Sequence, residues 1–275
     1  MQPKTDLESQ IERTIRLWFG NPFLTPTREE HGMFFATAAA YRSADLSRQV
    51  GAAIVNDRGE VLALGCNEVP KPQGGAYWHG DPRDYRDFNW GADENQRTKR
   101  EIVRELATRL QDSLKDEIDP DEAVRQWMDG DDALLKGTRL ASLIEFGRVV
   151  HAEMHALMEA ARRGISLDQA TLLCTTFPCH MCARHVLAAG VRRVIYIEPY
   201  PKSMTQELYG RAVSIDGEDG DPDSVGFCAF VGVAPRSYLR FFEAEVRKDK
   251  LGYPRAWSPM GSLPKISNPF MHPDM

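Results

Sequence analysis

The sequence contains no apolar run near the roughly 18 residues that would cross a bilayer. Its first residues, Met-Gln-Pro-Lys-Thr-Asp, are too polar for a secretory signal. It also has no Gly-x-x-x-x-Gly-Lys-Ser/Thr phosphate loop, no internal repeat and no low-complexity tract. These absences argue against a membrane protein, a secreted protein and a kinase with such a loop. We therefore expect a soluble cytoplasmic protein.

Positive charge and cysteine are also scarce. The chain has 34 Lys and Arg against 40 Asp and Glu, a net charge of −6, which disfavours a protein that coats nucleic acid. Five cysteines, an odd number, in 275 residues argue against a disulfide framework, because a chain of this size builds a core without cross-links. Of these cysteines, only Cys179 and Cys182 have the spacing of metal ligands.

The apolar residues that are present form short strands and amphipathic helices. Residues 50–54 and 61–66 predict two antiparallel strands around a turn. From residue 149 onward, short apolar segments alternate with helical ones, which is typical of an α/β sheet with crossover connections. The expected strands there are 171–175, 193–197 and 226–231, and the expected helices are 152–164 and 179–190.

The segments outside this pattern suggest a division of the chain. Residues 1–26 predict an N-terminal helix and linker, and residues 27–245 a single domain with a helical insertion at about 70–140. Residues 246–275 are rich in proline and predict a C-terminal arm without regular structure. Because the insertion and the arm both suggest contacts between copies, we expect a homo-oligomer.

A metal site is predicted at the starts of two helices. His151-Ala-Glu153 begins one helix, and Pro178-Cys179-His-Met-Cys182 begins another. One imidazole and two thiolates suit zinc, and three protein ligands leave a position for water. The two cysteines share a helix face near the positive end of the helix dipole. His151, Cys179 and Cys182 are therefore predicted to hold one catalytic zinc ion per chain.

Glu153 completes the predicted chemistry. It lies two residues after His151, close enough to reach the metal's water without being a ligand. Zinc lowers the pKa of bound water to about 7, so what remains is to move protons to a ring nitrogen and a leaving amine. Cys-x-x-Cys alone is more often a structural zinc site or a redox pair. The combination with His-x-Glu is the signature of zinc-dependent nucleobase deaminases.

On these residues the sequence resembles the cytidine deaminase-like superfamily over most of residues 27–245. His151 as first ligand resembles the deoxycytidylate, polynucleotide and tRNA deaminases more than the deaminases of free cytidine. The segment from His151 to His155 also resembles the riboflavin-pathway deaminases, which space their other two ligands further apart than Cys179 and Cys182. We interpret His155 as a packing or outer-shell residue, because the cysteines complete the ligand set.

Two further segments, Ser47-Arg-Gln-Val-Gly-Ala52 and Gly65-Cys-Asn-Glu-Val-Pro70, resemble the deoxycytidylate deaminase pattern. The resemblance implies that Ser47 and Arg48 lie near phosphate, that Asn67 binds the sugar and that Tyr200 approaches the nucleotide. We infer from its place beside Tyr200 that Lys202 meets a phosphate. The chain departs from the pattern at His155, where the family usually has Asn, and in its long insertion.

The nearest resemblance is to the deaminase part of bacterial anti-phage dCTP/dCMP deaminases. It rests on residues 42–43, 46–49, 67–70, 74–78 and 198–203. It implies depletion of nucleotides in anti-phage defence. Those proteins commonly carry an N-terminal P-loop domain, which this chain lacks.

Pattern and resemblance together predict a three-layer α/β/α sandwich with a mixed five-stranded sheet. The predicted function is zinc-dependent deamination of a deoxycytidine nucleotide, dCTP or dCMP. Whether a regulatory nucleotide also binds is left open. One alternative is a polynucleotide deaminase, which would need a basic track with stacking aromatics that the acidic segment after Glu198 does not offer. The other is a non-enzymatic nucleotide-sensing module that keeps zinc for stability.

Overall fold

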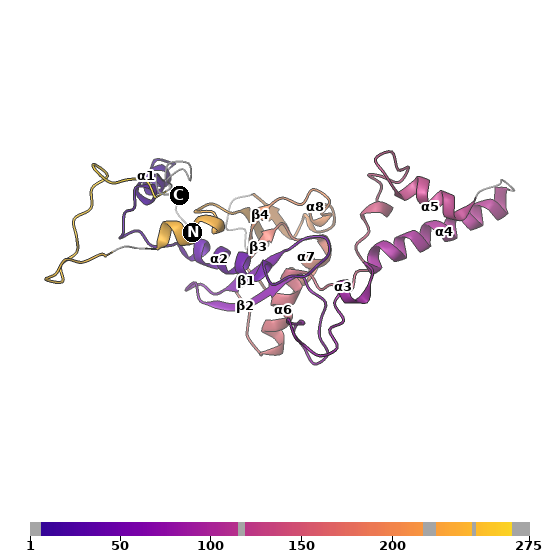
Figure 1. Ribbon diagram of the computed structural model, residues 1–275, viewed down its shortest axis with the longest axis horizontal. Helices are drawn as coiled ribbons and strands as arrows, with labels where there is room; N and C mark the ends of the chain where they lie inside the picture. Colours follow the sequence, from indigo (N-terminus) through magenta and orange to yellow (C-terminus); the bar gives the residue numbers. More distant parts are fainter. Residues whose placement is uncertain (1–6, 115–118, 217–223, 244–245, 266–275) are drawn as a thin grey trace.

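The computed structural model describes residues 7–114, 119–216, 224–243 and 246–265, and a mixed β-sheet lies at its centre (Figure 1). Within these residues the sheet has six strands in the order β2-β1-β3-β4-β6-β5. β1 pairs antiparallel with β2 and β3, whereas β3, β4, β6 and β5 pair in parallel. The strands are β1 (Gly51–Val55), β2 (Val61–Cys66), β3 (Thr171–Thr176), β4 (Arg193–Glu198), β5 (Val213–Ile215) and β6 (Val225–Ala229).

The predicted α/β fold is confirmed, with one strand more than the five expected. The additional strand, β5, contains only three residues. A segment that short shows no recognisable alternation of apolar and polar residues, so its sequence alone did not indicate a strand. It forms only because β6 supplies a parallel edge with which it pairs.

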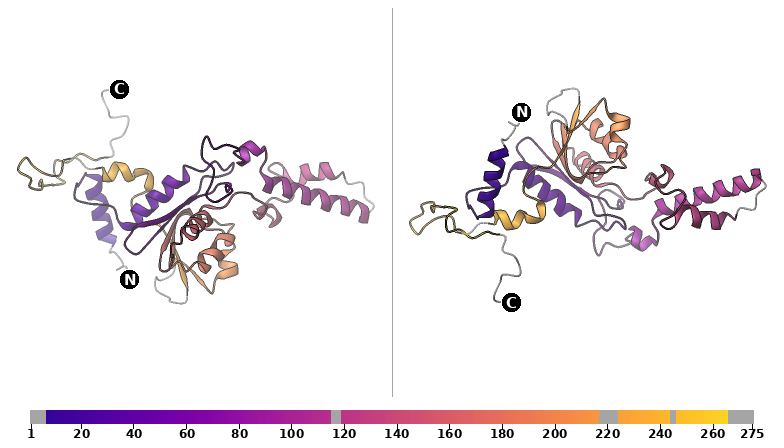
Figure 2. Two further views of the ribbon diagram at one scale, coloured as in Figure 1. Left: turned by 90° about the horizontal axis from the view of Figure 1, so that it is seen from below. Right: turned by 90° about the horizontal axis from the view of Figure 1, so that it is seen from above.

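Helices cover both faces of the sheet, which confirms the three-layer arrangement (Figure 2). On one face lies α2 (Arg28–Ala40), and on the other lie α6 (Ala152–Arg162) and α7 (His180–Ala188). Successive residues of a strand point to opposite faces, so Leu173 packs with α2 while Leu172 joins the core under α6 and α7. Both leucines are fully buried.

The N-terminal helix and the chain's last described segment lie together. In α1 (Leu7–Trp18), Arg13 donates two hydrogen bonds of 2.8 Å to the buried carboxylate of Glu30 in α2. The indole of Trp257 donates to the Phe19 carbonyl at 3.2 Å. Residues 246–265 contain no helix and no strand beyond one isolated bridge. The remainder of the predicted arm, residues 266–275, lies outside the described residues.

Between β2 and α6 the chain forms a helical projection (Figures 1 and 2). It comprises α3 (Asp87–Trp90), α4 (Glu94–Leu114), α5 (Pro120–Met128) and the 3-10 turn η1 (Leu140–Ser142). α4 and α5 form an antiparallel hairpin that extends away from the sheet. Among the described residues, no helix is both long and apolar enough to cross a membrane.

Candidate active site and metal centre

The N-termini of α6 and α7 meet beside the carboxyl end of β3. α6 precedes β3 and runs antiparallel to it, while α7 follows it, so both helices begin at the same edge of the sheet. His151 is the N-cap residue of α6, and Cys179 is that of α7. The Cys179 thiol accepts a hydrogen bond of 3.4 Å from the backbone N–H of Cys182. The fold therefore brings together residues separated by a whole strand.

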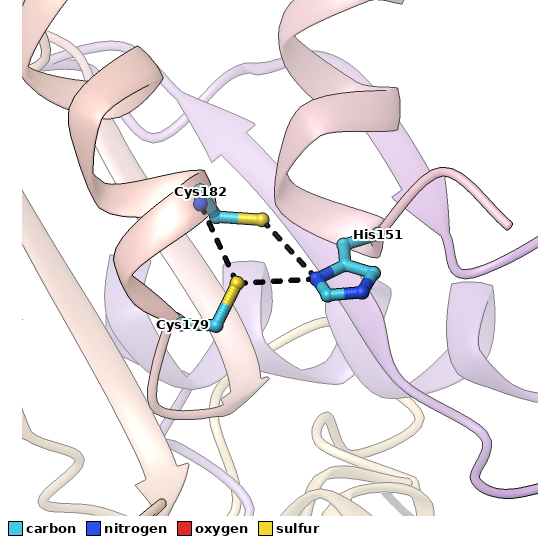
Figure 3. A group of neighbouring side chains, drawn as sticks. All are labelled: His151, Cys179 and Cys182. Carbon is cyan, nitrogen blue, oxygen red and sulfur yellow. Dashed lines mark hydrogen bonds between the residues drawn. The ribbon is translucent and has the colours of Figure 1, made fainter. Parts of the chain in front are cut away.

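The predicted ligands form one cluster (Figure 3). His151 Nδ1 lies 3.3 Å from Cys179 Sγ and 3.5 Å from Cys182 Sγ. The three donor atoms lie within 4.8 Å of one another, the one such group in the described part of the chain. Donors that share a tetrahedral zinc ion are about 3.5 Å apart, given bond lengths of about 2.0–2.3 Å. The separations and the donor types therefore fit zinc.

The electrostatics of the cluster favour a thiolate. Hydrogen bonds from the Cys182 thiol and from His151 lower the pKa of Cys179 to about 4. The hydrogen bond to Cys179 in turn raises the pKa of His151 to about 9. The thiolate is the form of cysteine that binds metal ions.

Glu153 lies in the first turn of α6, beside Cys182 and Cys179. It is only 4% exposed. Burial raises the pKa of its carboxyl group to about 7, because the charged form loses hydration. Burying a carboxyl group without a partner lowers the stability of the fold, so its presence here indicates a catalytic role or a bound partner.

The cluster opens into a cleft of about 230 Å³. Seven of the predicted site residues line this cleft: Ser47, Arg48, Asn67, His151, Glu153, Cys179 and Tyr200. Cys182 lies behind the cleft surface, where it is buried. Lys202 is exposed and does not line the cleft, so its contact with a phosphate stays a prediction.

Asn67 holds the backbone that forms one wall. Its side-chain oxygen accepts the Val50 N–H at 2.7 Å, and its amide donates to the carbonyl of Arg48. The Arg48 guanidinium donates to Glu198 at 2.9 Å and to Thr176 at 3.3 Å. Asn67 thus fixes the segment that carries Ser47 and Arg48, a role that sequence reasoning did not foresee. Its contact with a sugar stays a prediction.

A further part of the cleft lining comes from the insertion and the segment that follows it, where the sequence analysis predicted no site residue. Its members are Asp87, Asp93, Asn95, Ile144 and Gly147. Asn95 accepts a hydrogen bond from the Phe146 N–H at 3.3 Å, and Arg148 pairs with Asp87 at 2.9 Å. The position of these residues at the cleft depends on such long-range contacts, which the sequence did not indicate.

His155 lies away from the metal cluster. Its Nδ1 is 2.9 Å from the carbonyl of Cys66, in the interface between α6 and β2. It is buried there and has no contact with the ligand atoms in the described structure. This geometry agrees with the packing interpretation.

The structure combines a three-layer α/β/α sandwich with a histidine and two cysteines at two helix N-termini, beside a buried glutamate. This combination defines the class of zinc-binding deaminases. Residues 26–198 match the family described as the cytidine and deoxycytidylate deaminase zinc-binding region. The chain belongs to this family. Zinc is accordingly its cofactor, and the cluster is the place for it.

Curated relatives include deoxycytidylate deaminases. That of enterobacteria phage T4 is 39% identical over 54 residues, and that of Saccharomyces cerevisiae is 27% identical over 179 residues. ComE operon protein 2 of Bacillus subtilis is 35% identical over 66 residues. These matches cover 20%, 65% and 24% of this chain, respectively. They span only 28%, 40% and 35% of the relatives themselves.

Among solved structures, the dCMP deaminase of cyanophage S-TIM5 in complex with dCMP and dUMP is similar over 75% of this chain and 99% of its own. The identity is 20%, and the TM-score is 0.42. A tRNA:A34 deaminase structure matches 73% of this chain at 18% identity and a TM-score of 0.31.

Gly65 allows the close approach of β2 and α6 that positions the cluster. A Cβ atom there would collide with the backbone of Ala152 and Ala156. We expect Gly65→Ala to lower the free energy of unfolding by about 1–3 kcal/mol and to weaken zinc binding, because the N-terminus of α6 must shift. Denaturant unfolding and zinc titration against a competing chelator measure both effects.

The matched control is Gly51→Ala, whose Cβ atom would collide with α2 on the other face of the sheet. It should destabilise the fold similarly but weaken zinc binding less. Equal losses of zinc affinity in the two variants would contradict the positioning role of Gly65.

Proposed function

We propose that the protein hydrolyses the exocyclic amine of a deoxycytidine nucleotide, dCMP or dCTP, to give the deoxyuridine nucleotide and ammonia. The observation that carries this proposal is the buried carboxyl of Glu153 beside the three metal ligands, at the base of a cleft. Membership of the family and the deoxycytidylate deaminases among the relatives support it.

In the proposed reaction Glu153 moves the protons. Zinc held by His151, Cys179 and Cys182 would supply water with a pKa lowered to about 7. Glu153 takes a proton from the water that attacks C4 and delivers it to the ring nitrogen, and a proton then passes to the departing amine. Its fixed position on the first turn of α6 keeps its carboxyl beside the ligands throughout.

The cleft walls would hold the remainder of the nucleotide. We assign Ser47 and Arg48 to a phosphate, Asn67 to the sugar and Tyr200 to the nucleotide, with Lys202 at a phosphate further out. All of these except Lys202 line the cleft. In this proposal residues 27–245 are the catalytic domain, and residues 1–26 and 246–275 are accessory. Self-association, a regulatory nucleotide and a role in anti-phage defence stay predictions.

A polynucleotide substrate fits less well. The acidic residues Asp45, Asp87 and Asp93 line the cleft. A strand of phosphates would meet this negative charge, whereas proteins that bind single strands present a positive groove. The buried Glu153 argues against a sensor without catalysis, since zinc held for stability does not need it.

Ammonia release from dCMP, dCTP, cytidine and a cytosine-containing oligonucleotide, measured in parallel, tests the proposal. We expect product from dCMP or dCTP at rates at least about 100-fold above those from cytidine and the oligonucleotide, because several charged contacts to phosphate contribute about 1.5–3 kcal/mol each. Activity confined to the oligonucleotide would favour the polynucleotide reading. Thermal stabilisation by nucleotides without product would favour the sensor.

A further inference from the structure

Lys99 of α4 is a buried cation without a counter-ion in the described structure. It is 7% exposed, and its ammonium donates to the carbonyl of Ala141 at 3.2 Å. No carboxylate oxygen of the described residues lies within 4 Å of it. Burial lowers the pKa of Lys99, which reflects the cost of keeping a charge there. Buried charges are normally paired, so this ammonium is suited to an anion that binds from outside.

A second cation faces the same region. Lys202 is exposed, and its ammonium has no hydrogen bond or ion pair with any residue that the structure describes. The charge of Asp93 raises the pKa of Lys99, and Lys202 lies close enough for its charge to lower it. The Asp93 carboxylate is already engaged, because it accepts the N–H of Gln96 at 3.1 Å. Two cations that repel each other are stabilised by one shared anion.

Neither lysine lines the catalytic cleft itself, but each lies close in the chain to a residue that does. Lys99 is four residues after Asn95, on the same face of α4, and Asn95 lines the cleft. Lys202 is two residues after Tyr200, which also lines the cleft. An ion pair of 3.3 Å between Arg139 and Glu207, in α8 (Thr205–Tyr209), joins the insertion to the body near these positions.

The size of the cleft indicates what reaches this cation pair. Its volume of about 230 Å³ is below the roughly 300–1,000 Å³ of typical ligand pockets. A nucleotide that is bound by its base at the metal centre therefore extends out of the cleft, and a longer phosphate chain extends further.

We propose that Lys99 and Lys202 form a subsite for the terminal phosphates of a deoxycytidine triphosphate. This inference rests on the proposed function and adds to it that the insertion selects the longer phosphate chain. Lys99, within the insertion, is then a specificity-determining residue. A monophosphate would end before this subsite and gain nothing from it.

The test compares Lys99→Met and Lys202→Met with the wild type. Methionine keeps an unbranched apolar stem, so the packing of Lys99 is preserved while its charge is removed. We expect each variant to lower kcat/KM for dCTP by about tenfold, mainly through KM, since a hydrogen bond to a charged group contributes about 1.5 kcal/mol or more. For dCMP the change should stay within about twofold. Lys136→Met, in the same insertion but paired with Asp131, is the matched control.

Binding of the product nucleotides gives a second readout that does not depend on turnover. Calorimetry should show that dUTP binds more weakly to both variants and that dUMP binding is unchanged. Tripolyphosphate should inhibit the wild type more strongly than inorganic phosphate does, and lose this advantage in the variants.

Several results would overturn the inference while leaving the proposed function intact. These are deamination of dCMP but not of dCTP by the wild type, equal effects of the lysine variants on both nucleotides, or no effect on either. A regulatory nucleotide at the lysines would instead show as inhibition or activation of dCMP turnover by a nucleotide that is not deaminated, and that too would contradict a substrate subsite. Failure of the proposed function itself is recognised separately, because neither nucleotide would then yield ammonia.

Discussion

Glu153→Gln is expected to remove turnover of the deoxycytidine nucleotide and to leave the zinc in place. Glutamine has the shape of glutamate but cannot accept the proton from water or return it to the amine. General acid and base catalysis contributes about 10²–10⁴-fold per group, and Glu153 serves more than one transfer, so we expect a loss of at least about 10³-fold. Burial favours a neutral amide, so the variant should fold as stably as the wild type.

Ammonia release and zinc content, measured on the same preparation, check this expectation. The matched control is Glu159→Gln on the same helix, where the carboxylate pairs with Arg162 at 2.6 Å and lies outside the cleft lining. That variant should keep its turnover. If Glu153→Gln retained turnover within about tenfold of the wild type, Glu153 could not be the proton shuttle.

Cys179→Ala and Cys182→Ala should each lose both zinc and activity. Two remaining donors of the predicted tripod hold the ion far less tightly, and zinc binding stabilises the folded state as well as supplying the chemistry. We expect zinc content to fall from one ion per chain to less than about a tenth of that, with a lower thermal midpoint. Atomic absorption and thermal unfolding measure the two effects.

Cys228→Ala is the matched control, because Cys228 lies on β6 and outside the metal cluster. It should keep zinc and activity. A strong chelator should lower the thermal midpoint of the wild type and of Cys228→Ala, but leave that of Cys179→Ala unchanged. Full zinc content in either ligand variant would contradict the assignment of the metal centre.

The metal cluster was predictable because its chemistry is local. Cys182 follows Cys179 by three positions, about one helical turn, and His151 stands at the start of a helix of its own. Residue type and spacing were therefore enough to predict the three donors that the structure brings together and the acidic residue beside them. The strands were also predictable within a residue or two, except β5, which depends on its neighbour.

The cleft walls were only partly predictable. Ser47, Arg48 and Tyr200 were expected at the site, and the structure places them on its lining. The insertion was expected to contact other copies of the chain, yet it supplies Asp93 and Asn95 to the same cleft. Nothing in the charged sequence of α4 distinguishes these residues from others on a solvated helix face.

The sequence by itself determined the donor set, the acid and the alternation of strands and helices, because these follow from residue type and from spacings of a few residues. Only the tertiary structure decided which distant segments face one another across the metal centre, that Asn67 braces the wall carrying Arg48, and that Lys99 is buried near Lys202. Such contacts depend on how the insertion packs back onto the sheet. That packing depends on many weak interactions between residues far apart in the chain, and no local sequence pattern predicts it.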